Sequence, residues 1–179
     1  LVEMDKDLNI IPSIAQEWSI SEDGKTYSFN LKTNIKFHEH KLLNDRKVVA
    51  NDFTYSFDRI LDKKLASPGA WVLDKVKSYK AVNDSVFKIE LKEPFNAFLG
   101  ILSMKYCSVV PKEIVEYYGS DFRKNPIGTG PFKFKRWEEN IKLVLRKNVD
   151  YFEKDQKGNS LPYLEAIAIT FIPEKQSEF

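Results

Sequence analysis

The sequence holds a single cysteine, Cys107, among 179 residues. A disulfide within the chain is therefore impossible, which excludes the small folds that depend on a disulfide framework. Cys107 lies in an apolar run, residues 106–110, and this favours a buried structural thiol over a reactive nucleophile. One cysteine does not decide the compartment, because many large exported proteins have no disulfide.

Histidine is also scarce, since His38 and His40 are the only two. On a strand their side chains would point the same way and could chelate a metal ion. Two ligands are too few for a protein metal site, so the sequence favours a solvated loop here and predicts neither a metal nor a cofactor. The alternative from a different class is a metal-dependent hydrolase that uses both histidines.

Sequence patterns for nucleophilic or phosphate chemistry are missing as well. No serine stands in a nucleophile-elbow pattern, and neither histidine lies in a segment that resembles a catalytic loop. Gly128 and Gly130 suggest a phosphate loop only superficially, because the further glycines and the Lys-Ser/Thr ending are absent. The sequence therefore supports neither Ser-His-Asp catalysis nor a phosphate loop.

Neither strong charge nor a long apolar run is present. With 28 basic and 26 acidic residues the formal net charge is +2, which argues against nucleic-acid binding driven by charge. No apolar run reaches the roughly 20 residues that span a bilayer, and no signal peptide is recognisable. The chain starts at Leu1 without a methionine, inside an expected strand. We interpret it as a piece of a longer protein, with any targeting signal outside it.

What is present is a mixture of strand and helix signals. Tyr27, Phe29 and Leu31 alternate with polar residues after the turn signal Asp23-Gly24, which predicts a hairpin and a half-buried strand. Residues 86–91 alternate in the same way. The remaining expected strands lie around residues 132–134, 141–145 and 167–171.

Helical spacing appears in between. A helix is expected after a cap at Asn51 or Asp52. Its apolar face follows at helical spacing: Phe53, Phe57, Ile60 and Leu61. Pro111 is expected to start a second helix that ends at Gly119. Residues 94–102 are expected to form a short apolar helix, and residues 12–15 a helical turn. The mixture indicates an α/β (mixed α+β) fold class.

The segment Gly128-Thr129-Gly130-Pro131 separates two of these runs. Both glycines allow backbone angles that other residues resist, and Pro131 fixes its own φ and restricts Gly130. These residues are typical of a defined crossing between two structural units.

Several motifs occur in an order and spacing that resemble one family, the extracellular solute-binding proteins of family 5, which serve peptide and nickel ABC transporters. The motifs cover essentially the whole chain. They are Ile11 to Trp18, Asp23 to Leu31, Lys36-Phe37-His38, the helix Ala50 to Arg59 with Asp52 and Tyr55, Asn125 to Phe132, and Asn148-Val149-Asp150-Tyr151-Phe152. Within them, Trp18, Asp52, Tyr55, Gly128, Gly130 and Pro131 are interpreted as scaffold residues.

The resemblance implies a periplasmic-binding-protein-like fold of class II, in which two lobes close on a ligand. Residues 1–110 would form a small α+β subdomain of lobe I, and residues 111–179 an incomplete part of the main lobe I domain. Lobe II would be absent. In peptide-binding members, lobe II carries most of the groups that hold the peptide ends, so the chain alone is expected to bind peptide weakly or not at all.

The function implied is that of a substrate-binding component of an ABC importer, which delivers peptides to a membrane permease without chemistry on the ligand. Nickel, a sugar or another small solute is the alternative within the family. The resemblance also implies a monomer in the periplasm, or anchored to the cell envelope as a lipoprotein, with no nucleic-acid partner.

The chain departs from the family pattern in two places. Residues 39–47 form a longer segment than in most members, which resembles members from the Bacteroidetes. Gly69 stands where some oligopeptide-binding members have a tyrosine that meets the peptide N-terminus. Gly69, Ala70 and Trp71 are the candidate ligand-facing residues. A further alternative is a protein–protein contact domain that uses Trp71 and the long polar loop.

Overall fold

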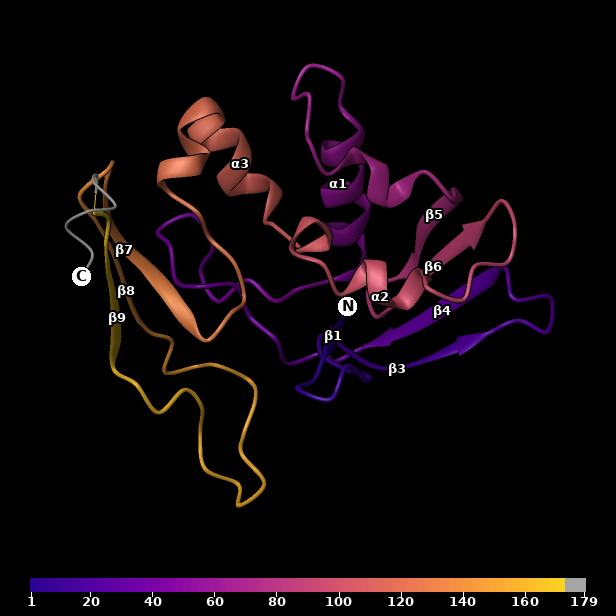
Figure 1. Cartoon of the computed structure of the whole chain (residues 1–179), viewed down its shortest axis with the longest axis horizontal. Coiled ribbons are helices and arrows are strands. Elements are labelled where there is room, and N and C mark those ends of the chain that lie inside the picture. The colour runs from indigo at the N-terminus through magenta and orange to yellow at the C-terminus, as the bar shows by residue number, and fades with distance from the viewer. Residues whose placement is uncertain (173–179) are drawn as a thin grey trace. The chain divides into compact units, whose positions relative to one another are not determined.

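Short antiparallel strands and short helices alternate along the chain, as the expected mixed class requires (Figure 1). The computed structural model describes residues 1–172. The strands are β1 (Val2–Met4), β2 (Ile10–Pro12), β3 (Ala15–Ile20), β4 (Thr26–Leu31), β5 (Val76–Asn83), β6 (Val86–Leu91), β7 (Phe132–Glu138), β8 (Lys142–Lys147) and β9 (Ala166–Thr170). The α-helices are α1 (Ala50–Leu61), α2 (Phe98–Leu102) and α3 (Lys112–Tyr118), and the 3₁₀ helices are η1 (Ala70–Leu73), η2 (Lys105–Cys107) and η3 (Gly119–Lys124).

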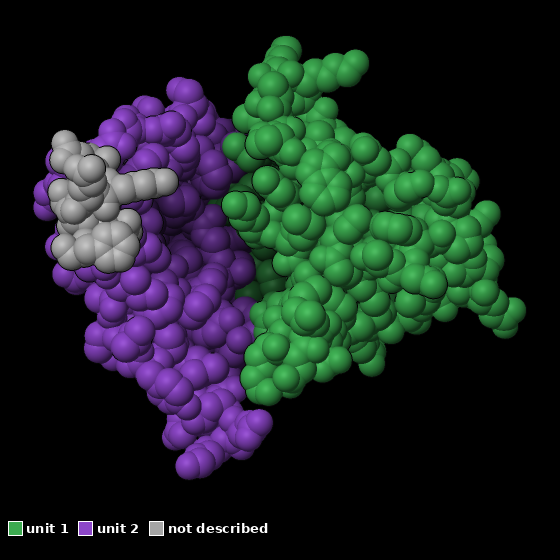
Figure 2. All heavy atoms as spheres, in the orientation of Figure 1, with its two compact units in different colours: residues 1–35, 47–112 green, residues 36–46, 113–179 purple. Residues whose placement is uncertain are grey.

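The chain divides into two compact units (Figure 2). Unit 1 comprises residues 1–35 and 47–112, and unit 2 comprises residues 36–46 and 113–179. Residues 36–46 thus belong with the C-terminal part of the sequence. Whether the units correspond to the expected subdomain and main lobe, divided near residue 110, stays a prediction.

Unit 1 is built on a four-stranded antiparallel sheet with the order β3-β4-β6-β5. The predicted alternation of residues 27–31 and 86–91 is confirmed, because Tyr27, Phe29 and Leu31 on β4 and Phe87, Ile89 and Leu91 on β6 are all buried. Helix α1 covers this face: the rings of Phe53 and Phe57 each lie 5.6 Å from that of Phe87. Burial of large aromatic rings is the main favourable contribution to such a core.

The expected cap of α1, at Asn51 or Asp52, was wrong by two or three residues. The helix begins after Val49, whose backbone N–H donates to the Asp52 carboxylate at 2.8 Å. Asp52 therefore accepts a backbone N–H at the start of the helix, as a capping residue would. It does so from the first turn of the helix, because the cap position itself is Val49. Phe53, Phe57 and Ile60 are buried as predicted, whereas Leu61, at the end of the helix, is 46% exposed.

The helical turn expected at residues 12–15 is absent. Residues 10–12 form β2, in which Pro12 pairs opposite Val2 of β1, and Ala15 begins β3 opposite Leu31 of β4. Pairing with strands elsewhere in the sequence overrides the local signal of Pro and Ser, and a two-stranded edge tolerates proline.

Edge strand β5 was not predicted, because only Val76 of its eight residues is buried and no apolar alternation results.

Unit 2 contains α3, η3 and a three-stranded antiparallel sheet with the order β7-β8-β9. The prediction for α3 is confirmed: Pro111 precedes it, and Gly119, at φ +52, follows its last residue. A left-handed residue in this place is the usual way to end a helix, and glycine adopts it without a steric penalty. The expected strands near residues 132, 143 and 169 are present as β7, β8 and β9.

Substitution Phe87→Ala should destabilise unit 1 by about 3–5 kcal/mol, because it removes the ring on which both Phe53 and Phe57 pack. Peptide-resolved hydrogen exchange of the β4 and β6 amides measures this within unit 1. The control Val82→Ala, at a side chain 55% exposed on β5, should change stability by no more than about 0.5 kcal/mol. Equal effects of the two substitutions would contradict the assignment of the core.

Candidate functional site

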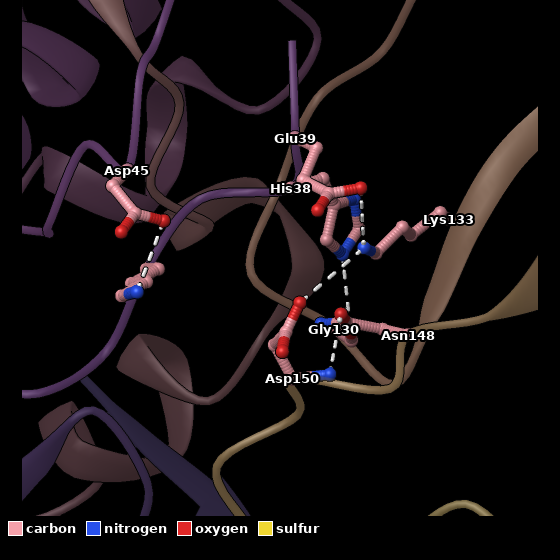
Figure 3. Close-up of polar contacts among 8 residues, drawn as sticks. His38, Glu39, Asp45, Gly130, Lys133, Asn148 and Asp150 are labelled. Carbon is pink, nitrogen blue, oxygen red and sulfur yellow. Dashed lines mark hydrogen bonds and ion pairs between the residues drawn. The ribbon is translucent and has the colours of Figure 1, made fainter.

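Three motifs that lie far apart in the sequence meet in unit 2 around the carbonyl oxygen of Gly130 (Figure 3). The His38 Nε2 atom lies 2.9 Å from this oxygen, and the Asn148 side-chain amide donates to it at 3.1 Å. The His38 backbone N–H donates to Gly128 O at 2.8 Å. We call these residues, His38, Gly128, Gly130 and Asn148, the Gly130 junction.

The histidine of the junction donates through its Nε2 atom. A carbonyl oxygen can only accept, so His38 carries its proton on Nε2. The side chain is buried, and burial lowers the pKa of the imidazole below its ordinary value. The nearby Lys133 ammonium lowers this pKa further, whereas the bond to Gly130 opposes both effects. His38 thus acts as a buried hydrogen-bond donor.

Asn148 connects the junction to the start of the next motif. Its backbone N–H donates to Pro131 O at 2.8 Å, and its side-chain oxygen accepts the Asp150 N–H at 3.2 Å. The residue is only 4% exposed. Because a buried amide must find partners for both its donor and its acceptor, these bonds fix how residues 148–150 leave β8.

Charged side chains surround the junction. Lys133 on β7 lies 3.4 Å from the Glu39 carboxylate and 3.8 Å from that of Asp150, and Lys36 pairs with Asp45 at 3.0 Å (Figure 3). They line a cavity of about 20 Å³. Such a volume holds about one water molecule, so this cavity cannot enclose a peptide. That the junction residues serve as scaffold stays a prediction.

The sequence suggested that Gly128 and Gly130 adopt backbone angles that other residues resist, and the structure does not show such angles. Neither Gly128 nor Gly130 has a left-handed φ, and a Cβ at either position would meet no atom within 4 Å. What the junction uses is their carbonyl oxygens, which any residue type would supply. The prediction of special backbone angles at these two positions was wrong.

The two histidines do not act as a pair. His40 Nε2 lies 3.1 Å from the Tyr118 hydroxyl of α3, and its Nδ1 accepts the Leu42 N–H at 3.3 Å. Both ring nitrogens of His40 are therefore engaged away from His38. The expected solvated loop was wrong for His38, which is 6% exposed. Within residues 1–172 no cluster of three or more metal-ligating side chains occurs.

The candidate ligand-facing residues lie together in unit 1, at the start of η1. A Cβ at Gly69 would approach the Tyr106 ring to 2.4 Å, so glycine is required here. Trp71 is 47% exposed, whereas its neighbour Val72 is buried.

Cys107, next to Tyr106, is a buried thiol as predicted, and burial raises its pKa to about 11. A thiol of this kind is unreactive at neutral pH.

The other residues interpreted as scaffold from the sequence lie in regular elements of unit 1. Trp18 is half-buried on β3 opposite Phe29, and Tyr55 is half-buried on α1. The helix that carries Asp52 and Tyr55 is tied to the segment before α3, because the Ser56 hydroxyl accepts the Val110 N–H at 3.0 Å.

No helix in the described part of the chain has the length and apolar character needed to cross a membrane.

Comparison with known proteins identifies the family. The family model described as bacterial extracellular solute-binding proteins, family 5 Middle, matches residues 9–179. The chain belongs to family 5 of these proteins. The di/tripeptide-binding protein 1 of Pseudomonas aeruginosa is 31% identical over 82% of the chain and 30% of its own length. The dipeptide-binding protein of Escherichia coli is 27% identical over 92% of the chain and 33% of its own length.

Solved structures of the family support the fold. The ABC transporter-associated periplasmic binding protein DppA from Helicobacter pylori, in complex with the peptide STSA, superimposes with a TM-score of 0.85 at 31% identity. NikZ from Campylobacter jejuni, in complex with Ni(L-His), gives 0.82 at 28% identity. Both matches cover 99% of this chain, but only 37% and 34% of those proteins. The family-5 chain thus spans about a third of the length of its relatives.

Substitution Asn148→Ala should destabilise unit 2 of this family-5 chain by about 1–3 kcal/mol, because Gly130 O and the Asp150 N–H lose a buried partner. Urea unfolding followed by fluorescence measures the change, with Trp137 as the tryptophan of unit 2. The matched control is Asn125→Ala, whose side-chain amide donates to Asp121 O in an exposed region. A loss at Asn125 as large as that at Asn148 would count against the junction.

The lowered pKa of His38 predicts how stability depends on pH. The unfolded chain binds a proton at His38 below about pH 6.5, whereas the folded chain resists it, so this contribution to stability is lost as the pH falls below that value. His38→Gln keeps an amide donor for Gly130 O but cannot titrate. Between pH 7 and pH 5 the Tm of the variant should fall less than that of the wild type. Parallel curves would show that His38 does not contribute to the pH dependence.

Proposed function

We propose that this chain is part of the substrate-binding component of an ABC importer and that the imported ligand is a peptide. The proposal rests on the family and on the names of the relatives, which include di/tripeptide-, dipeptide- and glutathione-binding proteins. The observation that carries it is the superposition of 99% of the chain on a peptide-bound member at a TM-score of 0.85.

In the proposed mechanism the chain supplies scaffold and part of the ligand surface of lobe I. A second lobe closes over the ligand, and the closed form delivers it to a membrane permease. No bond of the ligand is made or broken, so the protein is not an enzyme. It acts as a monomer in the periplasm or anchored to the cell envelope, which agrees with the periplasmic description of the Helicobacter protein.

Gly69, Ala70 and Trp71 are the proposed contribution of this chain to ligand contact. The Tyr106 ring fills the space in which a side chain at position 69 would lie, so a tyrosine there cannot be accommodated without a shift of Tyr106. Trp71, two residues on, presents a half-exposed aromatic surface. Aromatic side chains contribute large contact areas at low entropic cost, which suits a site that accepts varied peptide side chains.

Calorimetric titration with di-, tri- and tetrapeptides tests the proposal on the protein at the full length of its relatives. Binding is expected there, and little or none for residues 1–179 alone, because two thirds of the relatives' length is missing from this chain. Trp71→Ala should weaken binding about 10-fold, in the range of a buried aromatic contact. The control Tyr117→Ala, at another exposed aromatic residue, should leave the affinity unchanged.

A nickel complex is the second candidate ligand, because NikZ in complex with Ni(L-His) matches the chain about as well as the peptide-bound protein does. The same titration with Ni²⁺ and histidine separates the two candidates. Binding of the nickel complex without binding of any peptide would overturn the peptide proposal and leave the transport proposal intact.

A further inference from the structure

The long connection between β8 and β9, residues 148–165, contributes most of a cavity in unit 2 (Figure 1). The volume of this cavity is about 350 Å³. Pockets of that size take small ligands or single side chains. Its walls come from the start of β7, from the residues that follow β8 and from those that precede β9. The lining residues are Pro131, Phe132, Tyr151, Glu153, Leu161, Pro162, Tyr163 and Leu164.

Aromatic and aliphatic residues form nearly all of this lining. Among the described residues Glu153 is the only charged one that lines the cavity, since Lys154 and Lys157 of the same connection do not. The Glu153 backbone carbonyl accepts the Leu161 N–H at 3.3 Å, which ties the two ends of the connection together. Its carboxylate has no hydrogen-bond or ion-pair partner within residues 1–172. The cavity thus combines an apolar surface with one unpaired negative charge.

The ring of Tyr163 is held in place although it is 67% exposed. Its hydroxyl donates to the Asp155 carboxylate at 2.5 Å. The same carboxylate accepts the backbone N–H groups of Lys157 and Asn159 at 2.8 and 2.7 Å. The bonds from Tyr163 and Asn159 are the main reason that the pKa of Asp155 is lowered to about 2, so this acceptor stays ionised at neutral pH. Tyr163 therefore presents a positioned aromatic surface before any ligand binds.

A guanidinium group on an apolar stem matches this lining. Its planar face stacks on aromatic rings, its N–H groups pair with a carboxylate, and it is more weakly hydrated than an ammonium group. The stem of an arginine side chain can lie along apolar surface. Unit 2 already contains such stacking, because the Arg123 guanidinium lies 5.0 Å from the centre of the Trp137 ring. The Arg46 guanidinium likewise lies 5.8 Å from the centre of the Phe37 ring.

We propose that this cavity binds an arginine side chain of a second polypeptide, with Glu153 paired to the guanidinium and the rings of Tyr151 and Tyr163 against its planar face and stem. A residue within a polypeptide fits better than free arginine. No cation among the described residues lines the cavity to hold an α-carboxylate, and Glu153 would repel one. The cavity belongs wholly to unit 2, whereas Gly69 and Trp71 belong to unit 1, so this inference does not rest on the proposed ligand contacts.

Ligand-observed NMR titration of the protein at the full length of its relatives tests the proposal with N-acetyl-L-argininamide. The matched neutral compound is N-acetyl-L-citrullinamide, in which an uncharged urea of similar shape replaces the guanidinium. The arginine compound should bind at least about 10-fold more tightly, because only it carries the charge that pairs with Glu153. Free L-arginine should bind more weakly than the capped residue. Equal affinity for the two capped compounds, or tighter binding of free arginine, would overturn the proposal.

Variants locate the binding in the cavity. Glu153→Gln should weaken binding of the arginine compound about 10-fold and leave that of the citrulline compound unchanged. Tyr163→Ala should weaken both, because it removes an aromatic wall. The control Glu165→Gln changes an exposed carboxylate that pairs with Lys147 outside the cavity, and it should alter neither.

Arginine binding that is unchanged in Glu153→Gln would place the compound at another site and contradict the inference. Peptide binding by Glu153→Gln should equal that of the wild type. A failure of arginine binding and a failure of peptide binding can therefore be told apart.

Discussion

The arrangement of unit 2 depends on one backbone oxygen, that of Gly130. It accepts from the ring of His38 and from the side chain of Asn148, residues separated from it by 92 and 18 positions. Each donor is buried, so an alternative packing would have to leave at least one polar group without a partner, at a cost of about 1–3 kcal/mol. Through His38 this bond fixes where residues 36–46 lie against β7, and through Asn148 it fixes how the chain leaves β8. The motifs by which the family is recognised are, in this part of the chain, the members of one hydrogen-bonded cluster.

Unit 1 is organised by a different force. Its sheet and α1 are held together by aromatic rings around Phe87. Buried polar residues of α1 add hydrogen bonds: Asp52 accepts the Val49 N–H, and Ser56 accepts that of Val110. A core of this kind provides a rigid support for η1, on which Gly69 and Trp71 stand. The proposed ligand contacts at Gly69 and Trp71 would need such support, because binding residues on short loops are held in place by a stiff scaffold.

Strands with a buried face could be predicted from the sequence, because alternation reports burial directly. This holds for residues 27–31 and 86–91, and α3 could be predicted from Pro111 and Gly119, whose backbone preferences act locally. Edge strands β2 and β5 could not, since their pairing is non-local and their residues are mostly exposed. The sequence showed the members of the Gly130 junction only as separate motifs and did not indicate that they contact one another. His38 offers no sequence signal for burial, because a polar residue between loops is normally solvated, and the glycines suggested special φ values that the backbone does not adopt.

By itself the sequence determined the class of the chain, its family, and the absence of internal disulfides, because these follow from composition, periodicity and motif order. Only the tertiary structure decided what the motifs do. It showed that the Gly128 and Gly130 carbonyls serve as acceptors, that His38 and His40 have separate partners, and that Tyr106 leaves room for nothing larger than glycine at position 69. These facts depend on contacts between residues distant in sequence, which no local pattern specifies.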